Sequence, residues 1–424
     1  MNSSYLKTNS GGIAEITDFK ELIYRICQLC CSVLIVYFCW YVEAFGNLGL
    51  VVNGSFLLMS ACIAVIWLIE GEIRTNEIPY GIWNHLLIVV YSLVTGVFVA
   101  TDSSLLMHEV RQYFIYSIIV FAFCFVSAHY HSFIWILKSI NVAVIICSIH
   151  LIFFGYHYTA RRIVLSDNSN PNLLGTILVL GLFCLLYRTE FSFRSLSWII
   201  PEVCILTYNI VMTGSRKSFF AATGLLLIWG FSLVESVMKN GSKKQRILVW
   251  VIASLAVIAF VFFFNSFVTN TELFSRMQNK GTAETDDARV GMYITSLEIF
   301  KNKPLFGVGL NHFQFWSELG LYSHSTYAEM ISSFGFIGSV LFLPPFLYAV
   351  YQATIFAFRA DKGFRGKFVL GGCLIELFLG LGQIWFYDIS HFIFWTVIFL
   401  ILQEMSREDK KELVTDTRFK YVKY

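Results

Sequence analysis

Long apolar stretches, separated by short polar segments, make up most of this chain. A helix needs about 20 mainly apolar residues to cross the hydrocarbon core of a membrane. We therefore predict an all-α polytopic membrane protein with about 12 transmembrane helices. The predicted spans are residues 22–42, 50–70, 81–100, 110–128, 133–154, 172–187, 196–213, 217–238, 247–268, 326–350, 367–385 and 388–404.

The composition excludes several other classes of protein. Hydrophobic residues make up 57% of the 424 residues and charged residues only 14%, whereas soluble domains carry about 25% charged residues. One soluble fold cannot hide that much apolar surface. A soluble enzyme, a disordered chain and a nucleic-acid binder are therefore excluded, and membrane lipids are expected to surround the protein.

The distribution of Lys and Arg predicts the orientation of the spans, because cytoplasmic loops are enriched in these residues. The runs 239–246 (KNGSKKQR) and 359–367 (RADKGFRGK) are strongly basic. Placing them inside puts both termini in the cytoplasm, with residues 405–424 as a cytoplasmic tail. The external cations are then Arg111, Arg161, Arg162, Arg216, Lys217, Arg276, Lys280, Arg289, Lys301 and Lys303.

This topology leaves one large external loop, residues 269–325, between an N-terminal bundle of about nine spans (1–268) and the C-terminal helices (326–404). Loops of this length are usually functional or disordered. Here the apolar residues recur at helical spacing through 286–301, and Pro304 then ends the helix. We expect an amphipathic helix on the outer membrane face. Its apolar positions are Val290, Tyr293, Ile294, Leu297 and Phe300.

No metal site or cofactor is expected. All 10 Cys residues fall in apolar runs, and the pair Cys27 and Cys30 is interpreted as small buried hydrophobes rather than a redox or metal site. The sequence contains no Asp-x-Asp, HExxH, GxxxxGK[ST] or GxSxG motif. A nucleotide-sugar enzyme with a carboxylate-held metal, a zinc protease, a P-loop motor and an α/β-type lipase therefore each lack their signature.

The external cations nearest the bundle are candidates for binding an anion. Arg216 and Lys217 follow the seventh span in a very short turn, so both must sit at the membrane surface. They either bind a substrate or extend to lipid headgroups. Arg289 lies near the start of the loop helix, where it opposes the helix dipole. It either pairs with Glu284 or Asp286, or binds a phosphate, for which Arg geometry is well suited.

His324 is the external His at the mouth of the tenth span, and it is a candidate general base. The alternative is a hydrogen-bonded structural His. Asn170 and Asn172, in a polar external run near Arg161 and Arg162, either face a sugar or form an ordinary turn that caps the sixth span.

The order of several motifs resembles the O-antigen ligase/polymerase superfamily. Its pattern is an Arg, a helix, P-x-x-G-x-G, a variable stretch, H-N-x-Y-L-E and G-x-x-G. Here Arg289 precedes Lys303–Gly309 (KPLFGVG), followed by Ser323–Glu329 (SHSTYAE) and Phe334–Gly338 (FGFIG). The Thr213–Arg216 turn and the segment Asn170–Asn172 also match. The resemblance covers about residues 170–340, while the first 150 residues agree only in hydropathy.

The resemblance implies a GT-C-like membrane glycosyltransferase of the bacterial inner membrane. The donor would be a glycan on undecaprenyl pyrophosphate, transferred with inversion to an acceptor glycan, with a flippase and a chain-length regulator as partners. His324, Arg289 and Arg216 would be catalytic. Substrate-binding residues would be Lys217, Arg161, Arg162, Asn170, Asn172, Tyr327 and Glu329. Two departures concern the acceptor side: Ser325 replaces the usual Asn, and Ser333 stands where an acidic residue often occurs.

Three functions remain open. A polymerase joins repeat units on lipid carriers, and we favour it because the sequence identifies no lipid A partner. A ligase would instead move the finished chain to a lipid A core or another surface acceptor. A flippase of lipid-linked oligosaccharide is the alternative outside the enzymes, but we detect no internal repeat, which transporters often carry. Pro344 and Pro345 mark the one predicted mid-helix break.

Overall fold

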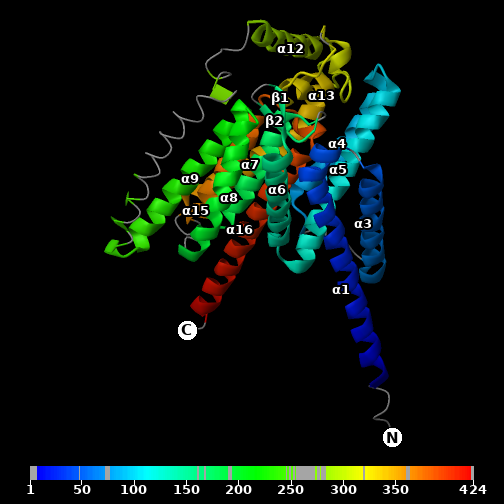
Figure 1. Ribbon diagram of the computed structural model, residues 1–424. Helices are drawn as coiled ribbons and strands as arrows, with labels where there is room; N and C mark the ends of the chain where they lie inside the picture. Colours follow the sequence, from blue (N-terminus) through cyan, green and yellow to red (C-terminus); the bar gives the residue numbers. More distant parts are fainter. Residues whose placement is uncertain are drawn as a thin grey trace.

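The computed structural model describes residues 7–46, 48–71, 77–159, 162–166, 169–189, 193–244, 246–247, 250–251, 254, 273–274, 277, 283–318, 320–359 and 363–421. Within these residues the chain is helical apart from one short hairpin (Figure 1). The N-terminal elements are α1 (Lys7–Val36), η1 (Tyr37–Tyr41), α2 (Val42–Phe45), α3 (Gly49–Glu70), α4 (Tyr80–Val99), α5 (Ser103–Tyr130) and α6 (Ile134–Phe154). The hairpin pairs β1 (Tyr156–Thr159) with β2 (Arg162–Val164) in antiparallel register.

The remaining elements carry the outer part of the molecule. They are α7 (Pro171–Tyr187), α8 (Phe193–Met212), α9 (Arg216–Asn240), α12 (Ala283–Asn302), η4 (Phe313–Phe315), α13 (Thr326–Phe342), α14 (Pro344–Phe358), α15 (Gly363–Leu379), η5 (Trp385–Tyr387) and α16 (Ile389–Tyr421).

The prediction of a multi-span helical protein is confirmed, but among the described residues fewer helices than the twelve predicted are long and apolar enough to be spans. Of the described helices, seven are long and apolar enough to cross a membrane, and a bent pair, α13 with α14, adds an eighth. Helices α7 and α8 occupy predicted spans but are shorter apolar helices, and α15 has 17 residues. The predicted span 247–268 lies almost wholly outside the described residues.

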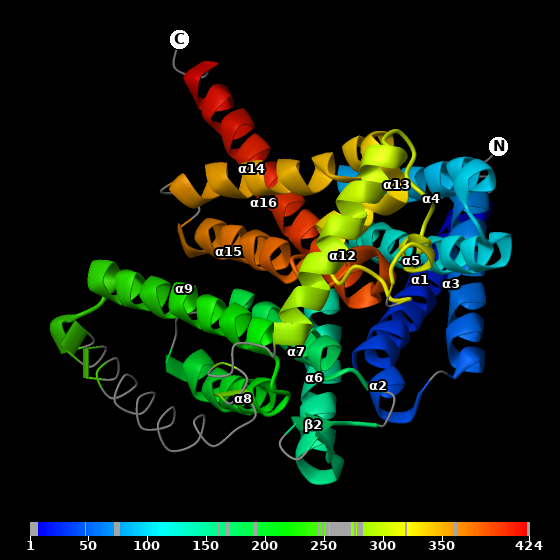
Figure 2. The same ribbon diagram turned by 90° about the horizontal axis from the view of Figure 1, so that it is seen from above.

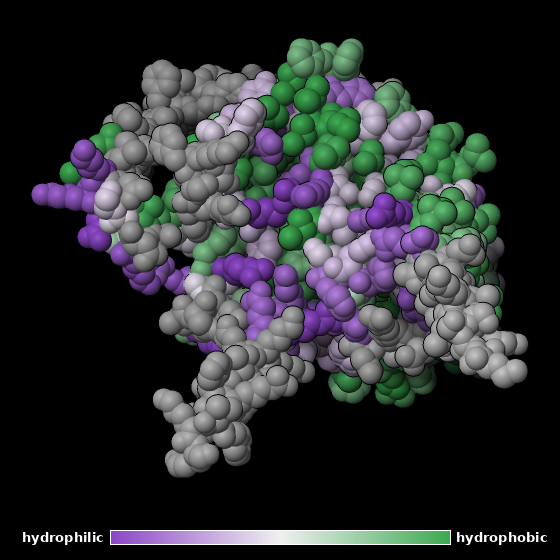
Figure 3. All heavy atoms as spheres, turned by 90° about the horizontal axis from the view of Figure 1, so that it is seen from below, coloured by the Kyte–Doolittle hydropathy of each residue, from purple (hydrophilic) through white to green (hydrophobic). Residues whose placement is uncertain are grey.

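The two ends of the bundle differ in chemistry. Both termini lie at one end, while the hairpin, α12 and the start of α13 lie at the other (Figure 1). Hydrophilic side chains gather on the face at the terminal end (Figure 3). Several ion pairs join neighbouring segments there. Arg365 pairs with Glu404 at 3.2 Å and Lys367 with Glu235 at 2.7 Å, while Arg407 of α16 pairs at 3.3 Å with Glu77, which lies just before α4.

Helix caps define the opposite end of the bundle. The Asp102 carboxylate accepts from the backbone N–H groups of Ser104 and Leu105 at the start of α5. Asn170 accepts from the N–H of Asn172 at the start of α7. Ser215 accepts from the N–H of Ser218 at the start of α9. Polar caps of this kind satisfy the unpaired N–H groups of a helix start, and they fix three helix starts at the level of the candidate site.

The core centres on α16, of which 83% of the spanning window is buried. Aromatic rings pack around it: the Phe346 ring lies 4.7 Å from Trp395, and Trp385 lies 5.3 Å from Trp395. Large rings in such offset and edge contacts contribute much of the packing in a core. All 10 cysteines are free thiols, and nine are buried, with Cys204 exposed. The interpretation of Cys27 and Cys30 as buried hydrophobes is therefore consistent with their positions.

The predicted tenth span is broken twice. Helix α13 bends by 43° into α14 at Pro344, as the proline pair predicts, because Pro disrupts the helix before it. A second break lies at Gly335, whose φ of 64° and ψ of −164° are not helical. The apolar pattern of this stretch did not indicate the second break, where the loop described next contacts the helix.

Candidate functional site

Two of the glycine motifs form one backbone interlock. The N–H groups of Val308 and Gly309 donate to the carbonyls of Ser332 and Ser333 at 2.9 and 3.0 Å. In return, Phe336 N–H donates to Pro304 O at 2.7 Å, and Ile337 N–H donates to Leu305 O at 3.1 Å. The segment after α12 therefore takes up backbone groups that the break in α13 frees.

The interlock requires glycine at both of its centres. A Cβ on Gly307 would lie 2.3 Å from the carbonyl oxygen of Ser332, and a Cβ on Gly335 would lie 2.6 Å from the backbone of Leu305 and Gly307. Both glycines also have positive φ, 68° and 64°, a region that other residues adopt at a cost. The motifs P-x-x-G-x-G and G-x-x-G are thus two halves of one contact that joins α12 to α13.

His324 lies in the loop just before α13, the helix that the interlock joins to the segment after α12. Its backbone is left-handed, with φ of 57°, which is uncommon outside glycine and often marks a functional position. The half-buried imidazole lies against Tyr322, with ring centroids 4.3 Å apart. His324 is therefore held in a fixed loop at the mouth of α13.

The loop is anchored by a buried carboxylate. Glu329, one turn into α13, is fully buried, and its Oε2 accepts from the backbone N–H of Ser323 at 2.8 Å. Its Oε1 accepts from the Tyr387 hydroxyl at 2.9 Å and from the Ser333 hydroxyl at 3.2 Å. Both carboxylate oxygens are engaged inside the protein, so this geometry fits a positioning role behind His324 better than a substrate contact.

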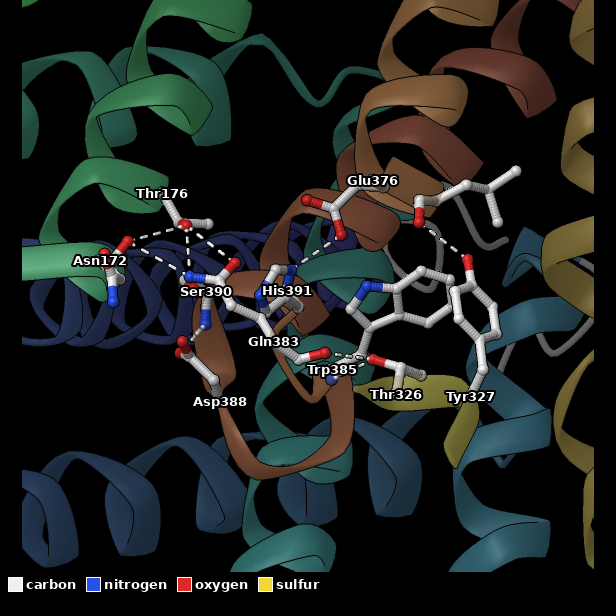
Figure 4. A network of polar contacts seen from close by, with 11 residues as sticks. Asn172, Thr176, Thr326, Tyr327, Glu376, Gln383, Trp385, Asp388, Ser390 and His391 are labelled. Carbon is white, nitrogen blue, oxygen red and sulfur yellow. Dashed lines mark hydrogen bonds and ion pairs between the residues drawn. The ribbon is translucent and has the colours of Figure 1, made fainter. Parts of the chain in front are cut away.

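A second loop, Gly380–Asp388, ties this region to α7 (Figure 4). Thr326 N–H donates to Gly380 O at 2.8 Å, and Thr326 Oγ1 donates to Gln383 O at 2.7 Å. The Gln383 amide donates to Thr176 Oγ1 at 2.8 Å and to Asn172 O at 3.2 Å. Gln383 therefore bridges the start of α7 and the residue two positions after His324.

Arg162 completes the α7 side of the site. Its guanidinium donates to Thr213 O at 2.8 Å and to Asn172 Oδ1 at 3.1 Å. Asn170 caps α7, as one of the two sequence interpretations holds. Arg162, Asn170 and Asn172 thus meet the turn that leads into Arg216. Arg161 lies outside the described residues.

Lys217 reaches the loop Gly380–Asp388 from α9. A Cβ on Gly382 would lie only 1.2 Å from Lys217 Nζ, so the ammonium occupies the space that a side chain at position 382 would fill. Lys217 and Arg289 both act electrostatically on His324: partial burial of the ring first, and then these two positive charges, lower the pKa of His324 below its usual value. The site therefore joins one imidazole and two cations, from α9 and α12.

Arg216, Arg289 and Tyr327, the other predicted site residues, lie near the starts of α9, α12 and α13. Arg216 is half-buried at the first position of α9. Arg289 is exposed and lies in the second turn of α12, because the helix begins at Ala283 rather than at 286; the dipole is weaker there. Tyr327 donates its hydroxyl to Leu377 O at 2.8 Å. On α12, Met292 and Ile299 pack toward Val308 and Phe313.

The apolar stripe expected on α12 faces away from that packing. Val290, Ile294 and Leu297 are exposed. Tyr293 donates its hydroxyl to Leu381 O at 3.2 Å, so α12 also contacts the loop Gly380–Asp388.

Two other histidines have structural partners. His312 is fully buried, and its ring nitrogens lie 2.7 Å from Leu310 O and 3.0 Å from Asp102 O. His391 Nδ1 lies 2.8 Å from the Glu376 carboxylate inside the bundle. His324 differs from both because its ring is half-exposed on the outer side.

The sequence motifs did not predict that the loop Gly380–Asp388 belongs to the site. The predicted site residues include neither Gly382, which leaves room for Lys217, nor Gln383, which connects α7 to Thr326. These residues fall inside the predicted span 367–385, but the helix ends at Leu379, so the prediction was wrong for residues 380–385. The available signal was weak: two glycines and an amide near the end of that span. Loop residues held by a rigid scaffold often carry function.

The arrangement suits transfer chemistry at an anionic leaving group. An imidazole with a lowered pKa is neutral at neutral pH and can accept a proton, while adjacent cations can stabilise developing negative charge. In the part of the chain that the structure describes, no three His, Cys, Asp or Glu side chains gather in a way that could hold a metal ion.

Comparison with known proteins identifies a domain. Residues 203–343 match the family described as O-Antigen ligase, and this segment contains Arg216, Lys217, Arg289 and His324 together with both halves of the interlock. No curated protein matches the chain. One similar solved structure is described as "Structural coordination of polymerization and crosslinking by a peptidoglycan synthase complex". It has 14% identity and a TM-score of 0.41, covering 76% of this chain and 97% of that chain.

Proposed function

Because residues 203–343 carry an O-antigen ligase domain in a multi-pass membrane protein, we propose that this protein is a polysaccharide repeat-unit polymerase. It transfers glycan from undecaprenyl pyrophosphate to a hydroxyl of an acceptor glycan on the outer face of the bacterial inner membrane. Both termini then lie in the cytoplasm. The observation that carries the proposal is the half-buried His324 under the influence of Arg289 and Lys217.

In the proposed reaction the acceptor oxygen attacks the anomeric carbon from the face opposite the pyrophosphate. The new C–O bond forms as the bond from the anomeric carbon to the pyrophosphate oxygen breaks, so the configuration inverts. His324 takes the proton of the acceptor hydroxyl. Lipid pyrophosphate leaves with the bonding electrons, and Arg289, Arg216 and Lys217 stabilise its charge.

The other predicted residues take supporting roles in this proposal. Arg162 and Asn172 present polar groups beside the turn before Arg216, where they line the approach of the donor. Arg161 and Asn170 are proposed to extend the same surface. Tyr327 and Glu329 position the loop of His324. A flippase supplies the donor, and a chain-length regulator is a further expected partner.

A ligase is the second candidate, since the family description names ligases and the same charges would serve the same leaving group. Complementation of a polysaccharide-deficient deletion strain separates the two. Wild-type protein and His324→Ala are compared at equal membrane levels, and lipid-linked glycans are analysed by gel and mass spectrometry.

The proposal predicts that His324→Ala accumulates single repeat units on the carrier. Accumulation of long unligated chains would identify a ligase instead. Normal polymer from the variant would remove His324 from the mechanism and favour the flippase.

A further inference from the structure

An apolar groove lies between α9 and α15, next to the candidate site. These helices pack along each other (Figure 2). The groove has a volume of about 310 Å³, and no polar side chain lines it. Gly224 and Ile228 lie on one side and Gly371, Leu374 and Phe378 on the other. Leu374 and Phe378 are exposed, so the groove opens to the side of the bundle, where lipid chains have access.

The outer end of the groove carries a positive charge. Lys217 precedes the groove residues Phe220 and Ala221 by three and four positions, so it lies one helical turn above them. On the other side, α15 ends at Leu379, one residue after Phe378. The chain then enters the loop that contains Gly382, the residue over which the Lys217 ammonium lies. The groove therefore leads directly to a cation that also acts on His324.

Glycines determine the shape of this groove. Gly224 has open space in front of it: a Cβ there would meet only Ile375 Cδ1, at 3.9 Å. At Gly371, by contrast, a Cβ would lie 2.4 Å from Ile228 Cδ1. The absence of a side chain at position 224 keeps the groove open, while Gly371 allows the two helices to approach.

We propose that the groove between α9 and α15 holds the first isoprene units of a polyprenyl pyrophosphate, with Lys217 binding the pyrophosphate at its outer end. This inference rests on the proposed function. Charge complementarity identifies the occupant as a lipid with an anionic head group. The head group must lie at Lys217, near His324, and the chain must be apolar because apolar side chains line the groove. A phospholipid in the same place would occupy the donor position without a sugar to transfer.

The groove contributes position rather than affinity in this proposal. Lipid tails are as apolar as the groove walls, so moving a chain from the bilayer into the groove yields little hydrophobic free energy. A seated tail instead fixes the height and direction of the pyrophosphate above the membrane, and positioning of this kind affects the rate strongly.

The inference can be tested with a substitution that fills the groove and leaves the cationic side chains unchanged. Gly224→Leu places a side chain in the open space, and Gly230→Leu is the matched control on the same helix, because Gly230 has no atom near its Cβ position and does not line the groove. Purified full-length variants are assayed with two donors that carry the same glycan, one on undecaprenyl pyrophosphate and one on methyl pyrophosphate, which has no isoprene unit to enter the groove.

We expect Gly224→Leu to lower kcat/KM for the undecaprenyl donor about tenfold, a typical size for steric discrimination in an apolar pocket. The value for the methyl donor should stay unchanged. Gly230→Leu should change neither. Equal rates for wild type and Gly224→Leu with the undecaprenyl donor, or equal losses with both donors, would overturn the assignment of the groove.

A binding experiment separates this inference from the proposed function. Diazirine-bearing undecaprenyl pyrophosphate, which carries no sugar, is crosslinked to the wild-type protein and the labelled peptides are mapped. Labels on α9 and α15 that undecaprenyl pyrophosphate displaces but phosphatidylglycerol does not would support the groove even if glycan transfer failed. Displacement by both lipids alike, or labels elsewhere, would contradict it.

Discussion

The Glu329 carboxylate accepts a hydrogen bond from the backbone N–H of Ser323 at 2.8 Å, one residue before His324. Through this bond a fully buried acid sets the path of the loop that carries the candidate base. The same acid accepts from Tyr387, so α13 and the segment before α16 both support His324.

Glu329→Gln should therefore reduce turnover without removing the base. The amide keeps the shape of the carboxylate but places an NH2 group where one acceptor oxygen stood, so at least one of the three hydrogen bonds must reverse or break. We expect kcat to fall about 10- to 100-fold, as small displacements of a reacting group do, with little change in KM. The exposed Glu318→Gln on the same outer side is the control. A large rise in KM with an unchanged kcat would indicate direct substrate contact instead.

The backbone interlock can be tested with alanine at its glycines. Gly335→Ala forces a Cβ to within 2.6 Å of the backbone of Leu305 and Gly307, at a residue with positive φ. We expect a loss of at least about 2 kcal/mol in stability, measured as a lower Tm in detergent, together with lower activity. Gly320→Ala is the control: its φ of 61° is as unusual, but nothing lies near its Cβ. Equal Tm shifts in both variants would show that the contact contributes nothing.

The fold and the interlock show what a sequence can and cannot reveal. Among the described residues most of the apolar stretches predicted helices close to their observed places, because each signal is local. The family motifs selected Gly307 and Gly335, but their pairing could not be read from the sequence, since it consists of backbone hydrogen bonds between residues 24 or 32 positions apart. The same holds for Gln383, whose partners Asn172 and Thr176 are far from it in the chain.

The number of predicted spans shows that hydropathy alone can predict a continuous helix where the chain is broken. Twelve apolar stretches satisfied the sequence rule, but Pro171–Tyr187 is only 17 residues long, and the tenth stretch is divided at Gly335 and Pro344. Hydropathy measures only the apolar character of a stretch. It does not indicate a break in the helix whose backbone groups are hydrogen-bonded by another segment, as at Gly335.

The position of Lys217 predicts the effect of a side chain at residue 382. In Gly382→Ala the new methyl group would stand 1.2 Å from Lys217 Nζ, so the ammonium must move away. We expect KM for the lipid-linked donor to rise about tenfold, corresponding to about 1.4 kcal/mol. Gly230→Ala, on an open face of α9, should leave KM unchanged. An unaltered KM in Gly382→Ala would mean that Lys217 does not bind the donor from this position.

The pH dependence follows from the lowered pKa of His324. The base must be neutral, so kcat/KM should fall as the pH drops through the pKa of His324, below the usual range for His. Lys217→Gln removes a positive charge that disfavours the imidazolium, which raises this pKa and moves the acidic limb of the profile to higher pH. Lys301→Gln, an exposed cation near the end of α12, should not move it. A limb that stays in place in Lys217→Gln would contradict the electrostatic account.

The most direct test of the central claim is the single-turnover rate of glycan transfer by purified His324→Ala, with saturating lipid-linked donor and equal amounts of folded protein. General-base catalysis predicts a loss of about 10²- to 10⁴-fold relative to wild type, while the donor still binds with unchanged affinity. A rate within a factor of about two of wild type would fall far short of that loss, and it would show that His324 does not accept the proton.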